Sequence, residues 1–253
     1  MRSTPEPVAA ALVVSFLLGA SLAGCGGDSG GRTQLTVLAA ASLRETFGQL
    51  EESFEKDHPY VDVVISFGSS SALAEQINQG SPADVIATAD DNSIGLVADD
   101  GNLEAAPTTF ATNTLVVVTP PDNPAEISSV DDLAAADFVV CDPSAPCGSA
   151  AQTILDNSGV IATPKSLEAD VKAVLTKVSL GEADAGIVYV TDARAAGDDL
   201  TSVEIAADVN VVNPYYIAAV KDTDHSDLAA DWVSLVMSPT GQGVLAAAGF
   251  GMP

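Results

Sequence analysis

A buried strand that ends in hydroxyl-bearing residues constrains the fold of this chain most. The predicted strand Val61–Phe67 contains a mostly apolar run rich in β-branched residues, Val63–Phe67, and a glycine and three serines follow it. Leu73 and Ile77 then recur at helical spacing, which predicts a strand, a tight turn and a helix that begins at Ser70 or Ser71. The first turn of a helix has unpaired N–H groups and a partial positive charge, so it can bind an anion without lysine or arginine. A serine at this position can also serve only as a helix cap.

The same unit occurs on both sides of this stretch. A short strand over Leu35–Ala39 leads through a turn at Ser42 into a helix whose apolar face carries Leu43, Phe47, Leu50 and Phe54. A third strand is predicted over Ala83–Ala87, followed by another short helix. Strands that alternate with helices form a parallel sheet covered on both faces. In such sheets ligands bind at the carboxyl ends of the strands, where Ser42 and Ser70 are expected.

The second half of the chain predicts another lobe of the same kind. We interpret the strand Asn113–Val118 and the proline-rich stretch 120–124 after it as the crossing into that lobe. Tyr215–Val220 is expected to be the strand that crosses back. Between the crossings we predict two buried strands and a helix with an apolar stripe: Phe138–Cys141, Ala185–Tyr189, and Leu167, Val171, Val174, Leu175 and Val178. Asp170 is expected to cap that helix, with Val171 as its first helical amide.

The first 25 residues have the pattern of a signal for export of the protein. Arg2 precedes an apolar run, Val8–Leu18, which is too short and too early for a membrane-spanning helix. The run leads to Leu22-Ala23-Gly24-Cys25, which resembles a bacterial lipoprotein signal with Cys25 as the lipidated residue. We therefore expect a signal peptide over 1–24, a tether over 25–32 and a lipid anchor on the extracytoplasmic face of the cell membrane. A simple secretory signal is the alternative.

Two further cysteines, Cys141 and Cys147, are predicted to form a disulfide, because exported proteins mature in an oxidising compartment. Two free thiols are the alternative. A metal site is not expected, since His58 and His225 are the only histidines and neither lies nearby in the sequence.

The net charge limits the classes of partner. The formal charge is −26 over 253 residues. Nucleic-acid binders carry basic stripes, so a nucleic-acid partner is not expected. Such a charge also repels anions at long range, and an anion site in this chain has to act through local dipoles.

Several short motifs, in this order and spacing, resemble the substrate-binding lipoproteins of molybdate transporters. They are Ala39-Ala40-Ala41-Ser42-Leu43, Phe67-Gly68-Ser69-Ser70-Ser71-Ala72-Leu73, Pro82-Ala83-Asp84, Leu115-Val116-Val117-Val118, Asp142-Pro143, Asp170-Val171 and Gly186-Ile187-Val188-Tyr189. The resemblance implies an α/β, two-lobed type II periplasmic-binding-protein fold, in which each lobe is a mostly parallel sheet flanked by helices. Lobe I would comprise 33–113 and 215–253, and lobe II would comprise 114–214. It also implies a monomer that works with the permease and ATPase of an ABC transporter.

The resemblance also implies a ligand set for a tetrahedral oxyanion. The first lobe would supply the hydroxyls of Ser42 and Ser70. The second would supply backbone amides near Cys147 and Val171 and the hydroxyl of Tyr189. The family commonly has a small residue such as alanine where Cys147 stands. No catalytic residue, cofactor or metal cation is implied.

The same donors predict which anions fit. A site made only of donors rejects an oxyanion that carries a proton, because that O–H would face another donor. Phosphate is partly protonated near neutral pH, and sulfate is smaller than molybdate or tungstate. We therefore expect molybdate or tungstate, with another oxyanion such as sulfate as the alternative. A remote alternative is an exported serine hydrolase, which would need a base and a nucleophile elbow, Gly-Xaa-Ser-Xaa-Gly, between a strand and a helix. Residues 33–253, where strands and helices are predicted, contain no such elbow.

Overall fold

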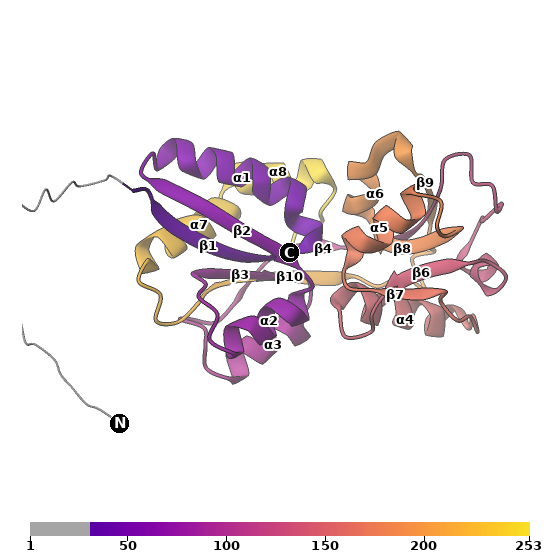
Figure 1. Ribbon diagram of the computed structural model, residues 1–253, viewed down its shortest axis with the longest axis horizontal. Helices are drawn as coiled ribbons and strands as arrows, with labels where there is room; N and C mark the ends of the chain where they lie inside the picture. Colours follow the sequence, from indigo (N-terminus) through magenta and orange to yellow (C-terminus); the bar gives the residue numbers. More distant parts are fainter. Residues whose placement is uncertain (1–30) are drawn as a thin grey trace, which may run out of the picture. The chain divides into compact units, whose positions relative to one another are not determined.

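The computed structural model describes residues 31–253 and contains two five-stranded sheets, each flanked by helices (Figure 1). The predicted two-lobed α/β class is confirmed. The predicted signal peptide over 1–24 and the predicted lipidation site, Cys25, lie outside the described residues.

The first lobe contains the sheet with strand order β2-β1-β3-β10-β4. β1 runs parallel to β2 and β3, whereas β10 runs antiparallel to β3 and β4. Its strands are β1 Thr33–Ala40, β2 Val61–Gly68, β3 Val85–Thr88, β4 Thr108–Asn113 and β10 Asn213–Ala219. Its helices are η1 Ala41–Leu43, α1 Arg44–Asp57, α2 Ser70–Asn78, α3 Asp91–Asp99, α7 Ser226–Met237 and α8 Pro239–Ala248.

Alternate side chains of the central strands enter two apolar layers. Val37 lies in the layer that contains Phe47 and Trp232, from α1 and α7. Leu38 and Ile86 lie in the layer that contains the apolar side chains of α2 and α3. Figure 1 shows α1, α7 and α8 on one face of the sheet and α2 and α3 on the other. Since both faces are covered, the strand ends are where this lobe can expose polar groups to a ligand.

The second lobe contains the sheet with strand order β7-β6-β8-β5-β9. β6 runs parallel to β7 and β8, and β5 runs antiparallel to β8 and β9. Its strands are β5 Leu115–Thr119, β6 Phe138–Cys141, β7 Ser166–Glu168, β8 Ala185–Tyr189 and β9 Thr201–Glu204. Its helices are η2 Val130–Ala134, α4 Pro146–Ser158, α5 Val171–Ser179, α6 Val190–Ala196 and η3 Gly197–Asp199.

The two crossings between the lobes lie side by side. Asn113 ends β4 in the first sheet, and Leu115 begins β5 in the second. The chain returns at Asn213, which is the cross-strand partner of Asn113. Most of the predicted strand Asn113–Val118 therefore belongs to β5 and follows the first crossing, whereas Asn113 ends β4 before it. The proline-rich stretch 120–124 is not part of the crossing. An apolar β-branched run has the same pattern in either sheet, so its residues alone cannot locate the crossing.

Two further expectations need correction. Leu167 belongs to β7 and is 51% exposed, so it does not join the apolar stripe of α5. Its spacing from Val171 matches a helix by coincidence, because the Asp170 cap starts the helix at Val171. Both sheets are also less parallel than expected, since β10 and β5 run antiparallel to both of their neighbours. Within residues 31–253 no helix is long and apolar enough to cross a membrane.

Candidate binding site

The five predicted ligand residues line one small cavity between the lobes. Ser42 and Ser70 reach it from the carboxyl ends of β1 and β2, and Cys147, Val171 and Tyr189 reach it from the second lobe. The cavity has a volume of about 10 Å³. That is room for about one water molecule, so the lobes have to move apart slightly to admit a larger ligand.

The first lobe contributes two buried serine hydroxyls. Ser70 is the first residue of α2, and its Oγ accepts a hydrogen bond of 3.0 Å from the backbone N–H of Ala89. Ser42 lies in η1, and its Oγ is 2.8 Å from the hydroxyl of Tyr215. Ser70 is 1% exposed and Ser42 is 4% exposed, so bulk water does not solvate either hydroxyl.

The second lobe contributes the starts of two helices. Asp170 caps α5 by accepting the N–H groups of Lys172 and Ala173, as predicted for this residue. At the start of α4, the carbonyl oxygen of Ala145 accepts the N–H groups of Gly148 and Ser149. None of the hydrogen bonds formed among residues 31–253 uses the N–H of Val171 or Cys147. These two amides are therefore available to a ligand in the cavity.

Tyr189 contributes a third hydroxyl. It is the last residue of β8, is 1% exposed, and receives a hydrogen bond of 3.2 Å from Asn213 Nδ2. Burial raises the pKa of Tyr189 well above its ordinary value. The side chain therefore stays protonated and can donate its hydrogen.

The described part of the cavity wall has no cationic side chain. Among the described residues that line it, none is lysine, arginine or histidine, and Asp170 carries the only carboxylate. Positive potential in the cavity comes from the first turns of α2, α4 and α5, together with the hydroxyl and amide hydrogens. The arrangement suits an anion without a proton.

One ion-pair cluster joins the lobes beside the cavity. Lys172 Nζ, from the first turn of α5, lies 2.8 Å from Asp192 Oδ1 in α6 and 2.8 Å from Glu45 Oε1 in α1. Asp192 is fully buried, which raises its pKa to about 6 although Lys172 opposes the shift. The charge of Lys172 is thus paired with two carboxylates.

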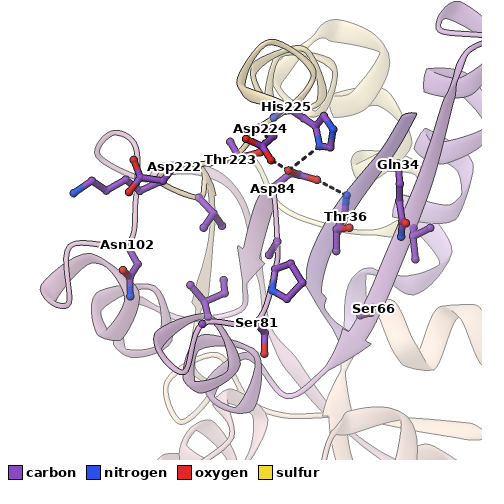
Figure 2. Close-up of a pocket in the computed structure, with 17 residues that line it drawn as sticks. Gln34, Thr36, Ser66, Ser81, Asp84, Asn102, Asp222, Thr223, Asp224 and His225 are labelled. Carbon is purple, nitrogen blue, oxygen red and sulfur yellow. Dashed lines mark hydrogen bonds and ion pairs between the residues drawn. The ribbon is translucent and has the colours of Figure 1, made fainter. Parts of the chain in front are cut away.

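A much larger cavity, of about 680 Å³, lies at the amino ends of β1 and β3 (Figure 2). There the carboxylate of Asp84 accepts the Thr36 N–H at 2.6 Å and contacts the side chains of Thr223 and His225. Asp222 and Asp224 also line this cavity. Its three carboxylates outnumber its one lysine, Lys221, so the small cavity between the lobes is the better candidate for an oxyanion despite its size.

A disulfide joins Cys141, at the end of β6, to Cys147 in the first turn of α4. It closes the short loop that precedes α4 and ties the start of that helix to the sheet. The free amide of Cys147 is therefore held by a covalent link as well as by the helix.

Several residues around the cavity were not predicted. Tyr215 and Asn213 contact Ser42 and Tyr189 from the returning crossing, and Ala89 contacts Ser70 from the end of β3. Lys172 and Glu45 contact each other across the lobes. These partners lie far apart in the sequence, and no motif or spacing in the chain signals the contacts.

Comparisons with known proteins agree with this geometry. The family described as bacterial extracellular solute-binding protein matches residues 35–251. The molybdate-binding protein ModA of Mycobacterium tuberculosis is 42% identical over 252 residues, covering 95% of this chain and 97% of that protein. The Escherichia coli protein of the same name is 33% identical over 209 residues, covering 78% of this chain and 81% of that protein.

Solved structures show the same fold. The periplasmic molybdate-binding protein of Azotobacter vinelandii superposes with a TM-score of 0.75 at 23% identity, covering 87% of this chain and 99% of that one. The sulfate-binding protein SubI of Mycobacterium tuberculosis superposes with a TM-score of 0.78 at 17% identity, covering 87% and 86%. The chain therefore belongs to the bacterial extracellular solute-binding proteins.

Proposed function

We propose that this protein captures molybdate or tungstate in the cavity between its lobes and delivers the anion to the permease and ATPase of an ABC transporter. One observation carries the proposal: buried hydroxyls and free helix-start amides converge on a cavity whose described wall has no cationic side chain. The molybdate-binding relative, 42% identical across nearly the whole chain, supports the choice of ligand. The family is one of binding proteins, not enzymes.

The proposed ligand donors are the hydroxyls of Ser42, Ser70 and Tyr189 and the amides of Cys147 and Val171. Each hydrogen bond to a charged group is worth about 1.5–3 kcal/mol. Five such bonds add up to about 7.5–15 kcal/mol. Association costs about 4–15 kcal/mol, and a small rigid anion has no internal freedom to lose, so these bonds can support binding without a counter-charge. The two amides can only donate, and a hydroxyl that donates to the anion does not offer it an acceptor, so an oxyanion that keeps a proton is disfavoured.

The proposal is tested by thermal unfolding of the purified protein with molybdate, tungstate, sulfate and phosphate. A ligand at about 1,000 times its Kd stabilises the folded state by about 4 kcal/mol. For a chain of this length that raises the Tm by about 8–16 °C. We expect this rise with molybdate and tungstate, a smaller one with sulfate and the smallest with phosphate. A rise with sulfate alone would favour the sulfate alternative, and no rise with any of the four would contradict the proposal.

The position of the protein in the cell is a further part of the proposal. We infer that residues 1–24 are removed, that Cys25 is lipidated and that 25–32 tether the protein to the extracytoplasmic face of the membrane. The lobes are taken as 33–113 with 215–253, and 114–214, and the protein as a monomer. The Leu22-Ala23-Gly24-Cys25 sequence supports the anchor, and mass spectrometry of the exported protein would detect the acyl chains on Cys25.

Reduction of the Cys141–Cys147 disulfide is expected to weaken both folding and molybdate binding. The chain-entropy model assigns about 2–2.5 kcal/mol to a loop this short, which lowers the Tm by about 4–10 °C. Affinity should fall as well, because the amide of Cys147 loses its covalent support. Calorimetry before and after reduction, with thiols counted, measures both effects. The variant Cys141→Ser/Cys147→Ser is the control and should not respond to the reductant. Equal affinity of the oxidised and fully reduced protein would contradict the expectation.

A further inference from the structure

The hydroxyls of the binding site are held by partners that lie behind the cavity wall. The N–H of Ala89 donates to Ser70 Oγ at 3.0 Å, and Asn213 Nδ2 donates to the Tyr189 hydroxyl at 3.2 Å. A hydroxyl that accepts a hydrogen bond on one side keeps its own hydrogen free for another. These two hydroxyls therefore keep their hydrogens available for a group in the cavity.

The orientation of the Asn213 amide is fixed by a second contact. Its Nδ2 also donates to the carbonyl oxygen of Ala89 at 3.2 Å, and a carbonyl oxygen can only accept. The amide therefore cannot flip, because its oxygen would then face the carbonyl oxygen of Ala89. One hydrogen goes to Ala89 and the other to Tyr189. Because Asn213 is 5% exposed, water does not compete for these bonds.

A parallel arrangement stands behind Ser42. The Tyr215 hydroxyl lies 2.8 Å from Ser42 Oγ and, at 3.5 Å, is within reach of Asn113 Nδ2. The backbone N–H of Thr114 donates to Asn113 Oδ1 at 3.0 Å, which turns the Nδ2 end of that amide toward the tyrosine. Asn113 Nδ2 also donates to Thr191 Oγ1 at 2.9 Å. Either hydroxyl of the Tyr215–Ser42 pair can donate, and when Tyr215 donates, the hydrogen of Ser42 is left for the ligand.

The two asparagines occupy matched places in the fold. Asn113 ends β4 and Asn213 begins β10, at the two crossings between the lobes, and the two residues pair across these strands. Neither lines the cavity. They lie in the segment about which the lobes would hinge, so their amides reach hydroxyls contributed by both lobes.

We propose that Asn213 is a specificity-determining residue that acts through Tyr189: its amide keeps the tyrosine hydroxyl a donor, and so excludes oxyanions that carry a proton. Asn113 plays the corresponding role for Ser42 through Tyr215. This inference rests on the proposed function and deepens it. Asp170, which carries the only carboxylate among the described residues of the wall, uses its Oδ1 to cap α5.

The test compares two dianions of similar shape. In slightly alkaline buffer phosphate carries one proton and molybdate carries none. Calorimetry gives the Kd of each for the wild type, for Asn213→Asp, for Tyr189→Phe and for the double variant. In Asn213→Asp the carboxylate accepts from Tyr189, whose hydroxyl then turns its lone pairs to the cavity. The ratio of phosphate Kd to molybdate Kd is expected to fall by about 10-fold or more, because one charged hydrogen bond is exchanged.

Repeating Asn213→Asp in a Tyr189→Phe protein separates the orienting effect on the Tyr189 hydroxyl from repulsion of the anion by the introduced carboxylate. The carboxylate repels both dianions alike, so repulsion largely cancels in the Kd ratio. With no hydroxyl to reorient, Asn213→Asp should change the ratio by no more than about twofold. Asn157→Asp is a control of the same chemistry, since the Asn157 amide donates to the Val209 carbonyl group in the second lobe. It should leave the ratio unchanged.

If Asn213→Asp does not fold, Asn213→Leu replaces it. The tyrosine hydroxyl then loses its donor and can turn either way, and the ratio should fall by about three- to tenfold. An unchanged ratio, or an equal fall with and without the Tyr189 hydroxyl, would overturn the inference while the proposed function stands. If the wild type binds none of the oxyanions, the proposed function fails, and this inference fails with it.

Discussion

The double variant Ser42→Ala/Ser70→Ala is expected to bind molybdate about 10²- to 10⁴-fold more weakly than the wild type. Each serine is proposed to donate one hydrogen bond to the anion, and each such bond is worth about 1.5–3 kcal/mol. No cationic side chain among the described residues of the wall can replace them. Ser70→Ala alone should weaken binding about 10- to 100-fold. Calorimetric titration with molybdate measures both changes.

The two serines also satisfy buried groups of the protein. Removing Ser70 leaves the N–H of Ala89 without its partner, and removing Ser42 does the same to the Tyr215 hydroxyl. Each loss should cost about 1–3 kcal/mol of folding free energy, so the Tm of each variant has to be measured alongside its affinity. Ser158→Ala is a matched control: this hydroxyl lies at the end of α4 and donates to the Leu155 carbonyl group. Unchanged affinity in a folded double variant would remove both serines from the ligand set.

The sequence predicts the first lobe well because its signals are local. The β-branched run of β2 and the apolar spacing of Phe47, Leu50 and Phe54 on α1 identify their elements without reference to the rest of the chain. Helix starts are local too, and for this reason the predicted cap at Asp170 is present in the structure. A strand–turn–helix unit also determines where its hydroxyl lies, at the carboxyl end of the strand. All five ligand residues that the family resemblance implies reach one cavity.

The features that the sequence does not predict depend on pairing between distant residues. The position of the first crossing depends on which sheet accepts β5, and its run Val116–Val118 would be buried in either. The partners of Ser42 and Tyr189 come from β10, where the register places Tyr215 and Asn213 behind the cavity. The ion pair of Lys172 with Glu45 joins two helices from different lobes. Such contacts leave no period or motif in the sequence.

Gly148→Ala is expected to destabilise the second lobe and to weaken molybdate binding together. A Cβ at Gly148 would overlap the carbonyl oxygen of Asp142 and lie 2.7 Å from the carbonyl oxygen of Cys141. Neither carbonyl group can easily move away from the added Cβ. The N–H of Asp142 is hydrogen-bonded to the Glu168 carbonyl oxygen at 2.8 Å, and Cys141 is tied to Cys147 by the disulfide.

The substitution therefore has to push the first turn of α4 away from β6, and that movement carries the amide of Cys147 out of the cavity. Overpacking of this kind costs about 2–3 kcal/mol or more, which lowers the Tm by about 4–12 °C. Loss of one charged hydrogen bond weakens binding by about 10- to 100-fold. Gly243→Ala in α8 is the matched control, because a Cβ there meets nothing within 4 Å. Its Tm should stay the same or rise, as expected for alanine in place of glycine in a helix. A Gly148→Ala protein with wild-type Tm and affinity would show that this turn can shift without cost, and would argue against a fixed Cys147 amide as a ligand.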